Sequence, residues 1–162
     1  KIGVLATSAT VKSKAYTKAI KRFRPGTFVM EQACPSLVPL IESDSFNKDR
    51  LREVILEYIN PLLNENVEAI LMGCSHYPLI RRLLFDLLPP NVRIIDPSDG
   101  IARYLDEIVG LPTTTSPGSQ LLKNTSIFVT SDPARFNSVV RKKFGISPEV
   151  QLINLRYKTF FS

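Results

Sequence analysis

The sequence predicts an α/β fold built on a parallel sheet. Short apolar runs alternate with longer segments of helical periodicity, and strands alternating with helices favour parallel pairing through right-handed crossovers. The chain has 162 residues, of which 44% are hydrophobic, so it can bury the core of one ordinary domain or two small ones. A charged fraction of 22% argues against a disordered chain. No apolar run approaches the roughly 20 residues of a membrane span.

The first elements are read from apolar runs and the breaks between them. Residues 2–6 form an apolar run and predict a strand, which stops at the small polar residues 7–10. A helix is expected over 11–23, closed by a Pro-Gly pair, and a short strand over 27–30. The following segment, 33–42, is interrupted by prolines, and we expect it to be a loop that ends in Glu42.

The clearest periodicity lies in residues 51–62. Apolar residues recur there at steps of three and one, which places them on one helix face, and Asn47 or Asp49 is expected to cap this helix. Residues 69–72 are continuously apolar and predict a strand buried on both faces.

The remaining elements repeat the alternation. We expect a helix over 79–88 that ends at two prolines, a strand over 92–95 and a helix over 101–109. Residues 111–124 are rich in Pro, Thr and Ser and predict a loop or linker. The last elements expected are a strand over 127–129, a helix from Asp132-Pro133 to Phe144, and a strand over 152–155.

Charge and cysteine content narrow the possible functions. The 21 Lys and Arg residues against 15 acidic residues give a net charge of +6, but the basic residues are scattered, which disfavours a nucleic-acid partner. Two cysteines, Cys34 and Cys74, exclude a disulfide framework, and the single histidine excludes a zinc set, so no metal is expected. A reducing, cytoplasmic location is expected.

Three turns lie where predicted strands end, which is where parallel sheets carry their chemistry: residues 7–10, 34–42 and 74–77. Cys74 follows a buried strand and precedes a predicted helix, whose N-terminus would favour the thiolate. The only histidine of the chain, His76, lies two residues further on. Together, the two residues predict a catalytic turn.

This turn resembles a known signature. Gly73-Cys74-Ser75-His76-Tyr77-Pro78 is similar to the Gly-Cys-Thr-His-Tyr-Pro segment of the glutamate racemases. Segments 3–16, 33–42, 95–97 and 129–136 resemble the same family in the same order. The resemblance runs over residues 2–145 and implies a parallel-sheet lobe of the two-lobed aspartate/glutamate racemase type.

The chain also departs from the family pattern. Ser75 replaces the usual threonine, and Ala6 and Ala9 stand where glycines are common. The family's Asp-Ser-Gly start and its first catalytic cysteine have no counterpart, and the chain begins without methionine, so it looks like a processed product or a piece of something longer. We expect residues 1–97 to form the second racemase lobe, and 98–162 to be a connecting helix, loop and C-terminal segment that packs on the absent first lobe.

The resemblance implies a reaction and roles for several residues. Glutamate racemases interconvert L- and D-glutamate without a cofactor, by two cysteines on opposite faces of the substrate, and so supply D-glutamate for peptidoglycan. Cys74 would be the cysteine that faces L-glutamate, with His76 and Glu42 assisting it. The substrate-binding residues would be Thr7, Thr10 and Ser75, whereas Cys34 is interpreted as a packing residue.

Other interpretations stay open. Aspartate or hydantoin racemases and related decarboxylases belong to the same superfamily, but they typically carry Glu where this chain has His76. The chain could also be a non-catalytic lobe that binds a small acid or a protein, or a basic nucleic-acid binder. The partner we expect is the small-molecule substrate glutamate, with no membrane partner, and a homodimer is left open.

Overall fold

The computed structural model describes residues 1–43, 47–109 and 126–154. It divides into two units, Lys1–Leu111 and Pro112–Ser162, and each is described by itself. The predicted linker over 111–124 and the end of the last predicted strand lie outside the described residues.

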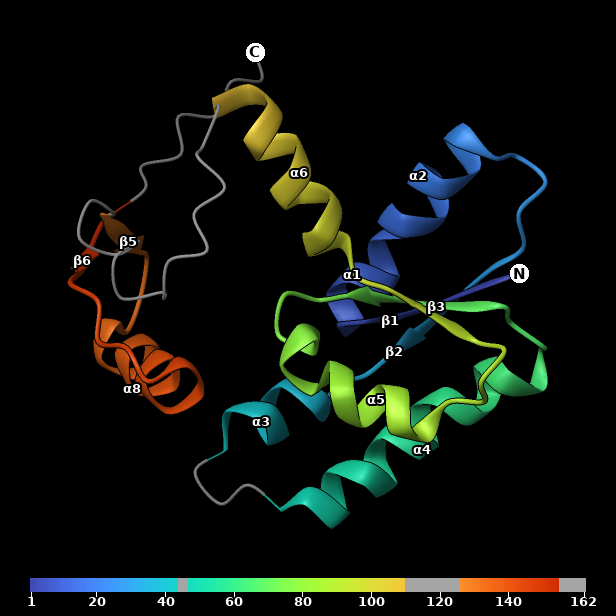
Figure 1. The fold of residues 1–162 in the computed structure, drawn as a ribbon, viewed down its shortest axis with the longest axis horizontal. Coiled ribbons are helices and arrows are strands. Elements are labelled where there is room, and N and C mark those ends of the chain that lie inside the picture. The colour runs from blue at the N-terminus through green and yellow to red at the C-terminus, as the bar shows by residue number, and fades with distance from the viewer. Residues whose placement is uncertain (44–46, 110–125, 155–162) are drawn as a thin grey trace. The chain divides into compact units, whose positions relative to one another are not determined.

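The first unit is built on a parallel sheet with strand order β2-β1-β3-β4 (Figure 1). The strands are β1 (Ile2–Ala6), β2 (Val29–Ala33), β3 (Ala69–Gly73) and β4 (Arg93–Ile95). In the register, Ala6 pairs with both Ala33 and Gly73. The predicted α/β class with a parallel sheet is confirmed.

Helices cover both faces of this sheet. In Figure 1, α3, α4 and α5 lie on one side of the strands and α1, α2 and α6 on the other. Their bounds are α1 (Ser8–Ser13), α2 (Ala15–Phe23), α3 (Leu37–Glu42), α4 (Lys48–Asn64), the 3₁₀ turn η1 (Tyr77–Ile80), α5 (Arg81–Leu87) and α6 (Pro97–Val109). Among the described residues, no helix is long and apolar enough to cross a bilayer.

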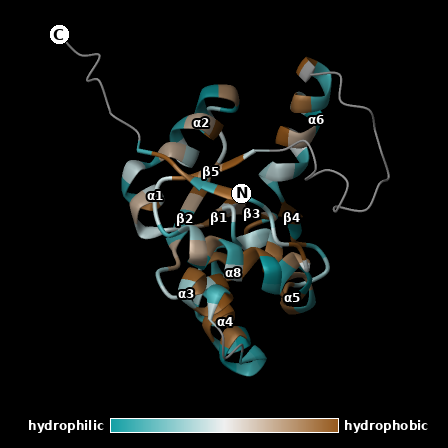
Figure 2. Cartoon of the chain, turned by 90° about the vertical axis from the view of Figure 1, so that its left-hand side faces the viewer, coloured by the Kyte–Doolittle hydropathy of each residue, from teal (hydrophilic) through white to brown (hydrophobic). Residues whose placement is uncertain are grey.

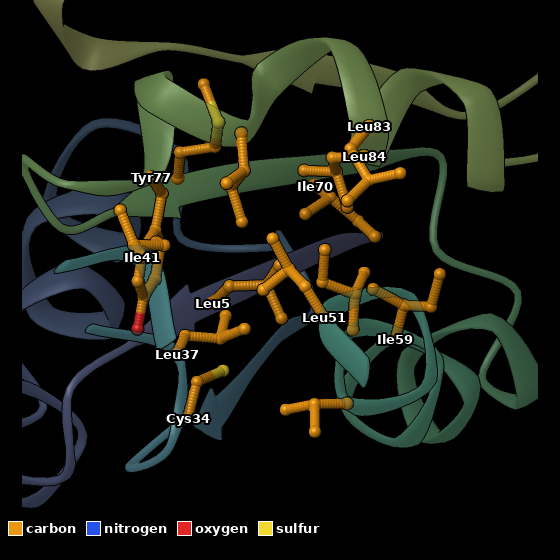
Figure 3. Close-up of a cluster of buried hydrophobic side chains, with 14 of the residues drawn as sticks. Leu5, Cys34, Leu37, Ile41, Leu51, Ile59, Ile70, Tyr77, Leu83 and Leu84 are labelled. Atoms are coloured by element: carbon orange, nitrogen blue, oxygen red, sulfur yellow. The ribbon is translucent and has the colours of Figure 1, made fainter. Parts of the chain in front are cut away.

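The main core lies between the sheet and the layer that contains α4 (Figure 3). The amphipathic character of α4 is visible in Figure 2, where polar and apolar residues alternate along the helix. Its buried side chains are Leu51, Val54, Ile55, Ile59 and Leu62, as the spacing predicts, while Tyr58 is half-buried. The Asn47 side chain accepts the Arg50 N–H at 2.9 Å, so Asn47 is the cap and Asp49 lies in the first turn.

Truncation of Ile59 tests the contribution of this core. Ile59 is fully buried. We expect Ile59→Ala to lower the free energy of unfolding by about 2–5 kcal/mol. The substitution loses the free energy of transferring the removed methyl and methylene groups from water to the core, and it leaves a cavity whose cost adds to that loss. Urea denaturation followed by circular dichroism measures this change. Glu57→Ala, at an exposed position of the same helix, should change stability by less than about 0.5 kcal/mol.

The helix predicted over 11–23 is in fact two helices. The Thr7 side chain accepts the Thr10 N–H at 3.4 Å and caps α1, so the helix begins three residues earlier than expected. The Ser13 hydroxyl donates to the carbonyl of Thr10 at 2.7 Å and accepts from the Ala15 N–H. These side-chain bonds compete with the helical ladder, and Lys14 takes the left-handed conformation with φ 56° between α1 and α2.

The second strand and the segment after it also differ from the expectation. The strand predicted over 27–30 lies at Val29–Ala33, where Glu31 is accommodated because it accepts bonds from the N–H and hydroxyl of Thr17. The segment expected to be a loop contains α3, and Glu42 is its last residue. Pro39 fits this helix because N–H groups in the first turn have no intrahelical acceptor.

The other elements of the first unit lie close to their predicted places. The helix expected over 79–88 is η1 followed by α5, and the strand expected over 92–95 is β4. The helix α6 begins at Pro97, earlier than the expected 101, because the Asp96 carboxylate accepts from the N–H of Ser98 at 3.0 Å and from its hydroxyl at 2.6 Å.

The second unit contains β5 (Ile127–Val129), α8 (Pro133–Phe144) and β6 (Val150–Leu152), with β5 parallel to β6. The Asp132 side chain accepts the Arg135 N–H at 2.9 Å, so the predicted cap is confirmed. The strand expected to begin at residue 152 begins at Val150, and among the described residues it ends at Leu152. The expected division of the chain at residue 97 into two racemase segments stays a prediction.

Candidate active site

The carboxyl edge of the sheet gathers the residues that the sequence singled out. Because the four strands are parallel, the residues that directly follow them lie at one edge: Thr7 after β1, Cys34 after β2, Cys74 after β3 and Asp96 after β4. Ala6 is in register with Ala33 and Gly73, so the first three of these residues leave adjacent strands at the same level.

The structure brings Cys74, His76 and Glu42 into one line of contacts. The Cys74 Sγ lies 3.9 Å from His76 Nδ1, and His76 Nε2 lies 2.7 Å from Glu42 Oε1. Cys74 directly follows β3, His76 directly precedes η1, and Glu42 is the last residue of α3. The side chains of His76 and Glu42 are 33% and 17% exposed, so the pair is partly shielded from water while Cys74 is half-buried.

This geometry orients the imidazole. A carboxylate against Nε2 favours the proton on that nitrogen, since the carboxylate can only accept. Nδ1 is then left as an acceptor facing the Cys74 thiol. A thiol, an imidazole and a carboxylate in this order can move a proton to and from sulfur, which suits general acid–base chemistry.

The local environment of Cys74 differs from the expectation in one respect. The helix that follows it is a single 3₁₀ turn of four residues, and not the N-terminus of a long helix. The Tyr77 N–H donates to the carbonyl of Cys74 at 3.1 Å and closes the turn. Tyr77 and Ile80 are buried and anchor it to the core, so the turn positions the thiol mainly by packing.

The three predicted substrate-binding residues have different settings. The hydroxyl oxygens of Thr7 and Thr10 lie 2.9 Å apart, and both residues are half-buried at the start of α1. Ser75 lies on the Cys74 turn and is exposed. All three lie in segments that directly follow strand ends, but their binding roles stay a prediction.

Cys34 belongs to the core. It is 1% exposed, and its Sγ donates to the carbonyl of Gln32 at 3.4 Å. Burial raises the pKa of the Cys34 thiol to about 12, although bonds with Ala6 and Tyr77 partly offset this effect. The thiol is therefore neutral near pH 7, in keeping with its interpretation as a packing residue.

The difference between the two cysteines gives a direct prediction. At about pH 8, iodoacetamide should modify Cys74 in the folded chain and leave Cys34 unmodified, because only an accessible thiolate reacts. Peptide mass spectrometry before and after urea unfolding measures both sites. Modification of Cys34 in the folded state would contradict the assignment, while its modification in urea is the internal control.

Two further residues, Asp96 and Tyr16, lie near the strand ends, and their contacts were not predicted from the sequence. Asp96 is buried, caps the start of α6 and lies 3.7 Å from Arg81 Nη1. Tyr16 on α2 lies against Gly73, directly before Cys74. The position of Asp96 directly after a predicted strand could have indicated its place at the sheet edge. Tyr16 lies in a segment that resembles the family, but no local sequence pattern indicates its contact with Gly73.

In the described part of the chain, no group of three or more His, Cys, Asp or Glu side chains could hold a metal ion.

Comparisons with known proteins identify the family of this chain. The Asp/Glu/Hydantoin racemase family model matches residues 1–105. The chain is 39% identical over 162 residues to a glutamate racemase of Prochlorococcus marinus (strain NATL2A), and 46% identical over 154 residues to one of Synechococcus sp. (strain CC9605). These matches cover 100% and 94% of this chain but 61% and 58% of the relatives, so the chain spans about three fifths of their length.

Solved structures show the same fold. A glutamate racemase of Francisella tularensis, solved in complex with D-glutamate, matches with a TM-score of 0.72 and 28% identity, over 94% of this chain and 57% of that one. The RacE1 isoform from Bacillus anthracis matches with a TM-score of 0.76 and 23% identity, over 95% and 57% of the two chains. With more than half of its residues matched by the family model, and a thiol–imidazole–carboxylate line at the carboxyl edge of its sheet, this chain belongs to the Asp/Glu/hydantoin racemase family.

Proposed function

We propose that this chain is the part of a glutamate racemase that supplies one of two acid–base cysteines, Cys74. The observation that carries the proposal is the contact line from Cys74 through His76 to Glu42. The names of the relatives support glutamate as the substrate, and the Francisella tularensis structure was solved with D-glutamate bound.

The proposed reaction moves one proton on each face of the substrate. The Cys74 thiolate takes the proton from the α-carbon of L-glutamate, so that the C–H bond breaks and an S–H bond forms. A second cysteine, from a lobe beyond this chain, delivers a proton to the opposite face of the carbanion. In the reverse direction the two sulfurs exchange roles, and no cofactor takes part.

His76 and Glu42 support the thiol in this scheme. Nδ1 of His76 accepts the proton that leaves the Cys74 sulfur and returns it, while the Glu42 carboxylate stabilises the imidazolium that forms. Thr7, Thr10 and Ser75 offer hydroxyl and N–H groups to the carboxylates or the ammonium of glutamate. The reaction would take place in the cytoplasm. Its product, D-glutamate, would serve peptidoglycan synthesis and thereby cell-wall biogenesis and cell shape.

The division of the chain at residue 97 forms part of the proposal. Residues 98–162 would connect to the other lobe and pack on it. Exposed apolar side chains support this assignment, because such surface is normally covered in a folded protein. They are Ile101, Tyr104, Leu105 and Ile108 of α6, Phe128 of β5 and Leu152 of β6.

Substitution of Glu42 tests its role. In the longer enzyme, we expect Glu42→Gln to lower kcat about 10²-fold, with the larger loss for L-glutamate, because the amide keeps a hydrogen bond to Nε2 but lacks the charge that stabilises the imidazolium. Circular dichroism of glutamate, started separately from each enantiomer, measures the rates. Glu53→Gln on α4 is the control, because Glu53 is exposed and paired with Arg50. Equal rates for Glu42→Gln and the parent would remove Glu42 from the mechanism.

The choice of substrate needs a separate experiment. The longer enzyme is incubated with L-glutamate, L-aspartate and a 5-substituted hydantoin, and loss of optical activity is followed for each. We expect racemisation of glutamate alone, with no release of carbon dioxide. Activity on aspartate or the hydantoin without activity on glutamate would overturn the proposed substrate.

A further inference from the structure

The ring of Tyr16 presses against the residue that precedes Cys74. A Cβ placed on Gly73 would lie 2.8 Å from Tyr16 Cε2, 2.9 Å from the carbonyl oxygen of Leu5 and 3.1 Å from Ala6 Cβ. The first two distances are shorter than real Cβ contacts, and the Leu5 carbonyl belongs to the backbone of β1, so a side chain at position 73 would force the strand or the ring to move. The end of β3 is therefore enclosed by the backbone of β1 and by an aromatic ring from α2, and glycine allows this close approach.

The hydroxyl end of the Tyr16 ring makes this contact. Cε2 is bonded to the ring carbon that carries the hydroxyl, so the phenol lies close to the Gly73–Cys74 peptide. Two effects raise the pKa of Tyr16, first its burial and then the charge of the Cys74 thiolate. The second effect is an electrostatic interaction between the Tyr16 phenol and the Cys74 sulfur, which is consistent with the two groups lying near each other. The phenol stays neutral at physiological pH and so does not act as a base.

The two sides of Cys74 differ in character. The His76–Glu42 pair depends on α3, which lies on one face of the sheet, whereas Tyr16 belongs to α2 on the other face (Figure 1). The side of Cys74 that faces α3 therefore carries groups that exchange protons, whereas the side that faces α2 carries the edge of the Tyr16 ring. Because Gly73 has no side chain of its own to pack, the ring supplies the contact that limits its backbone motion.

We propose that Tyr16 is a positioning residue for Cys74, whose ring holds the Gly73–Cys74 peptide so that the thiol stays facing His76. The contact itself is independent of the substrate, while its importance for racemisation rests on the proposed function. The ring carries this role and the hydroxyl does not, so phenylalanine should substitute for Tyr16 and alanine should not.

Alkylation of Cys74 in the 162-residue chain tests the contact without any enzyme assay. Iodoacetamide rates are measured at Cys74 by peptide mass spectrometry over a pH series for the parent, Tyr16→Phe and Tyr16→Ala. We expect Tyr16→Phe to remain within about twofold of the parent, and Tyr16→Ala to react at least about fivefold faster at the high-pH plateau, because the thiol gains access and freedom. Phe23→Ala is the control, since Phe23 lies on the same helix and is 80% exposed.

The outcomes separate the possibilities. Equal plateau rates for Tyr16→Ala and the parent would overturn the proposal, and so would a Tyr16→Phe variant that reacts like Tyr16→Ala. Far-ultraviolet circular dichroism checks that each variant folds. Should Tyr16→Ala be unfolded, Tyr16→Leu takes its place, because leucine retains bulk but does not reach Gly73, and the same increase is expected.

Kinetics of the longer enzyme give the second readout. We expect Tyr16→Ala to lower kcat for L-glutamate about 10²-fold, since small misplacements of a reacting group cost this much, with KM changed less than about threefold. Tyr16→Phe should restore kcat. A Phe variant as slow as the Ala variant would assign the function to the hydroxyl and overturn positioning by the ring. If the parent enzyme does not racemise glutamate, the proposed function fails, while the alkylation rates still decide whether Tyr16 positions Cys74.

Discussion

Cys74→Ser in the proposed longer racemase is expected to lower kcat by about 10³-fold or more in both directions. A serine hydroxyl is far less acidic than a thiol, so it does not form the anion that removes the α-proton near neutral pH. The His76 imidazole 3.9 Å away does not compensate, because a neutral imidazole is too weak a base to ionise a hydroxyl without a further driving force. Racemisation needs an acid–base group on each face of the substrate, so the loss of the Cys74 sulfur slows the reaction from L-glutamate and from D-glutamate alike.

The measurement is proton NMR in deuterated water. The α-hydrogen signal of glutamate disappears as racemisation exchanges it, and the experiment is run separately from L-glutamate and from D-glutamate. Cys34→Ala is the matched control, because it removes the other thiol of the chain, which is buried in the core, and should retain racemisation. A Cys74→Ser enzyme that still racemises glutamate would exclude Cys74 from the mechanism.

The second large effect concerns the 162-residue chain by itself. We expect it to racemise glutamate below the limit of detection, because it offers one matching cysteine, whereas the proposed mechanism needs two on opposite faces. The chain covers 61% and 58% of the length of two glutamate racemases, and under the proposed function we expect part of the substrate-binding surface to lie outside this chain. Its affinity for glutamate should be weak for the same reason.

The same NMR experiment tests this expectation at equal molar concentrations of the chain and of the longer enzyme. Full racemisation by the chain alone would contradict the proposal that a second lobe is needed.

The reading frame upstream of Lys1 distinguishes a catalytic role from a non-catalytic one. A frame that encodes the Asp-Ser-Gly segment and a second cysteine supports the racemase, and one without them favours a lobe that only binds a small acid or a protein.

Much of the fold could be predicted because its signals are local. The steps of three and one in residues 51–62 identify a helix face, and the continuous apolar run at 69–72 identifies a strand. The caps Asn47 and Asp132 were predictable, since a short polar side chain before a helix bonds to the free N–H groups of its first turn. Helix boundaries were less predictable where side chains compete with the backbone, as Ser13 does before Lys14.

The parallel α/β fold and two members of the candidate site could be inferred from the amino-acid sequence. Cys74 and His76 are two residues apart, so a single turn after a strand places both at the carboxyl edge of the sheet. Glu42 was named only through the family resemblance, because its contact with His76 joins positions 34 residues apart. The contact between the Glu42 carboxylate on α3 and the imidazole, at 2.7 Å, and the packing of the Tyr16 ring against Gly73 are visible only in the folded chain. Such contacts depend on how the helices pack on the two faces of the sheet, and no local periodicity or capping pattern encodes that packing.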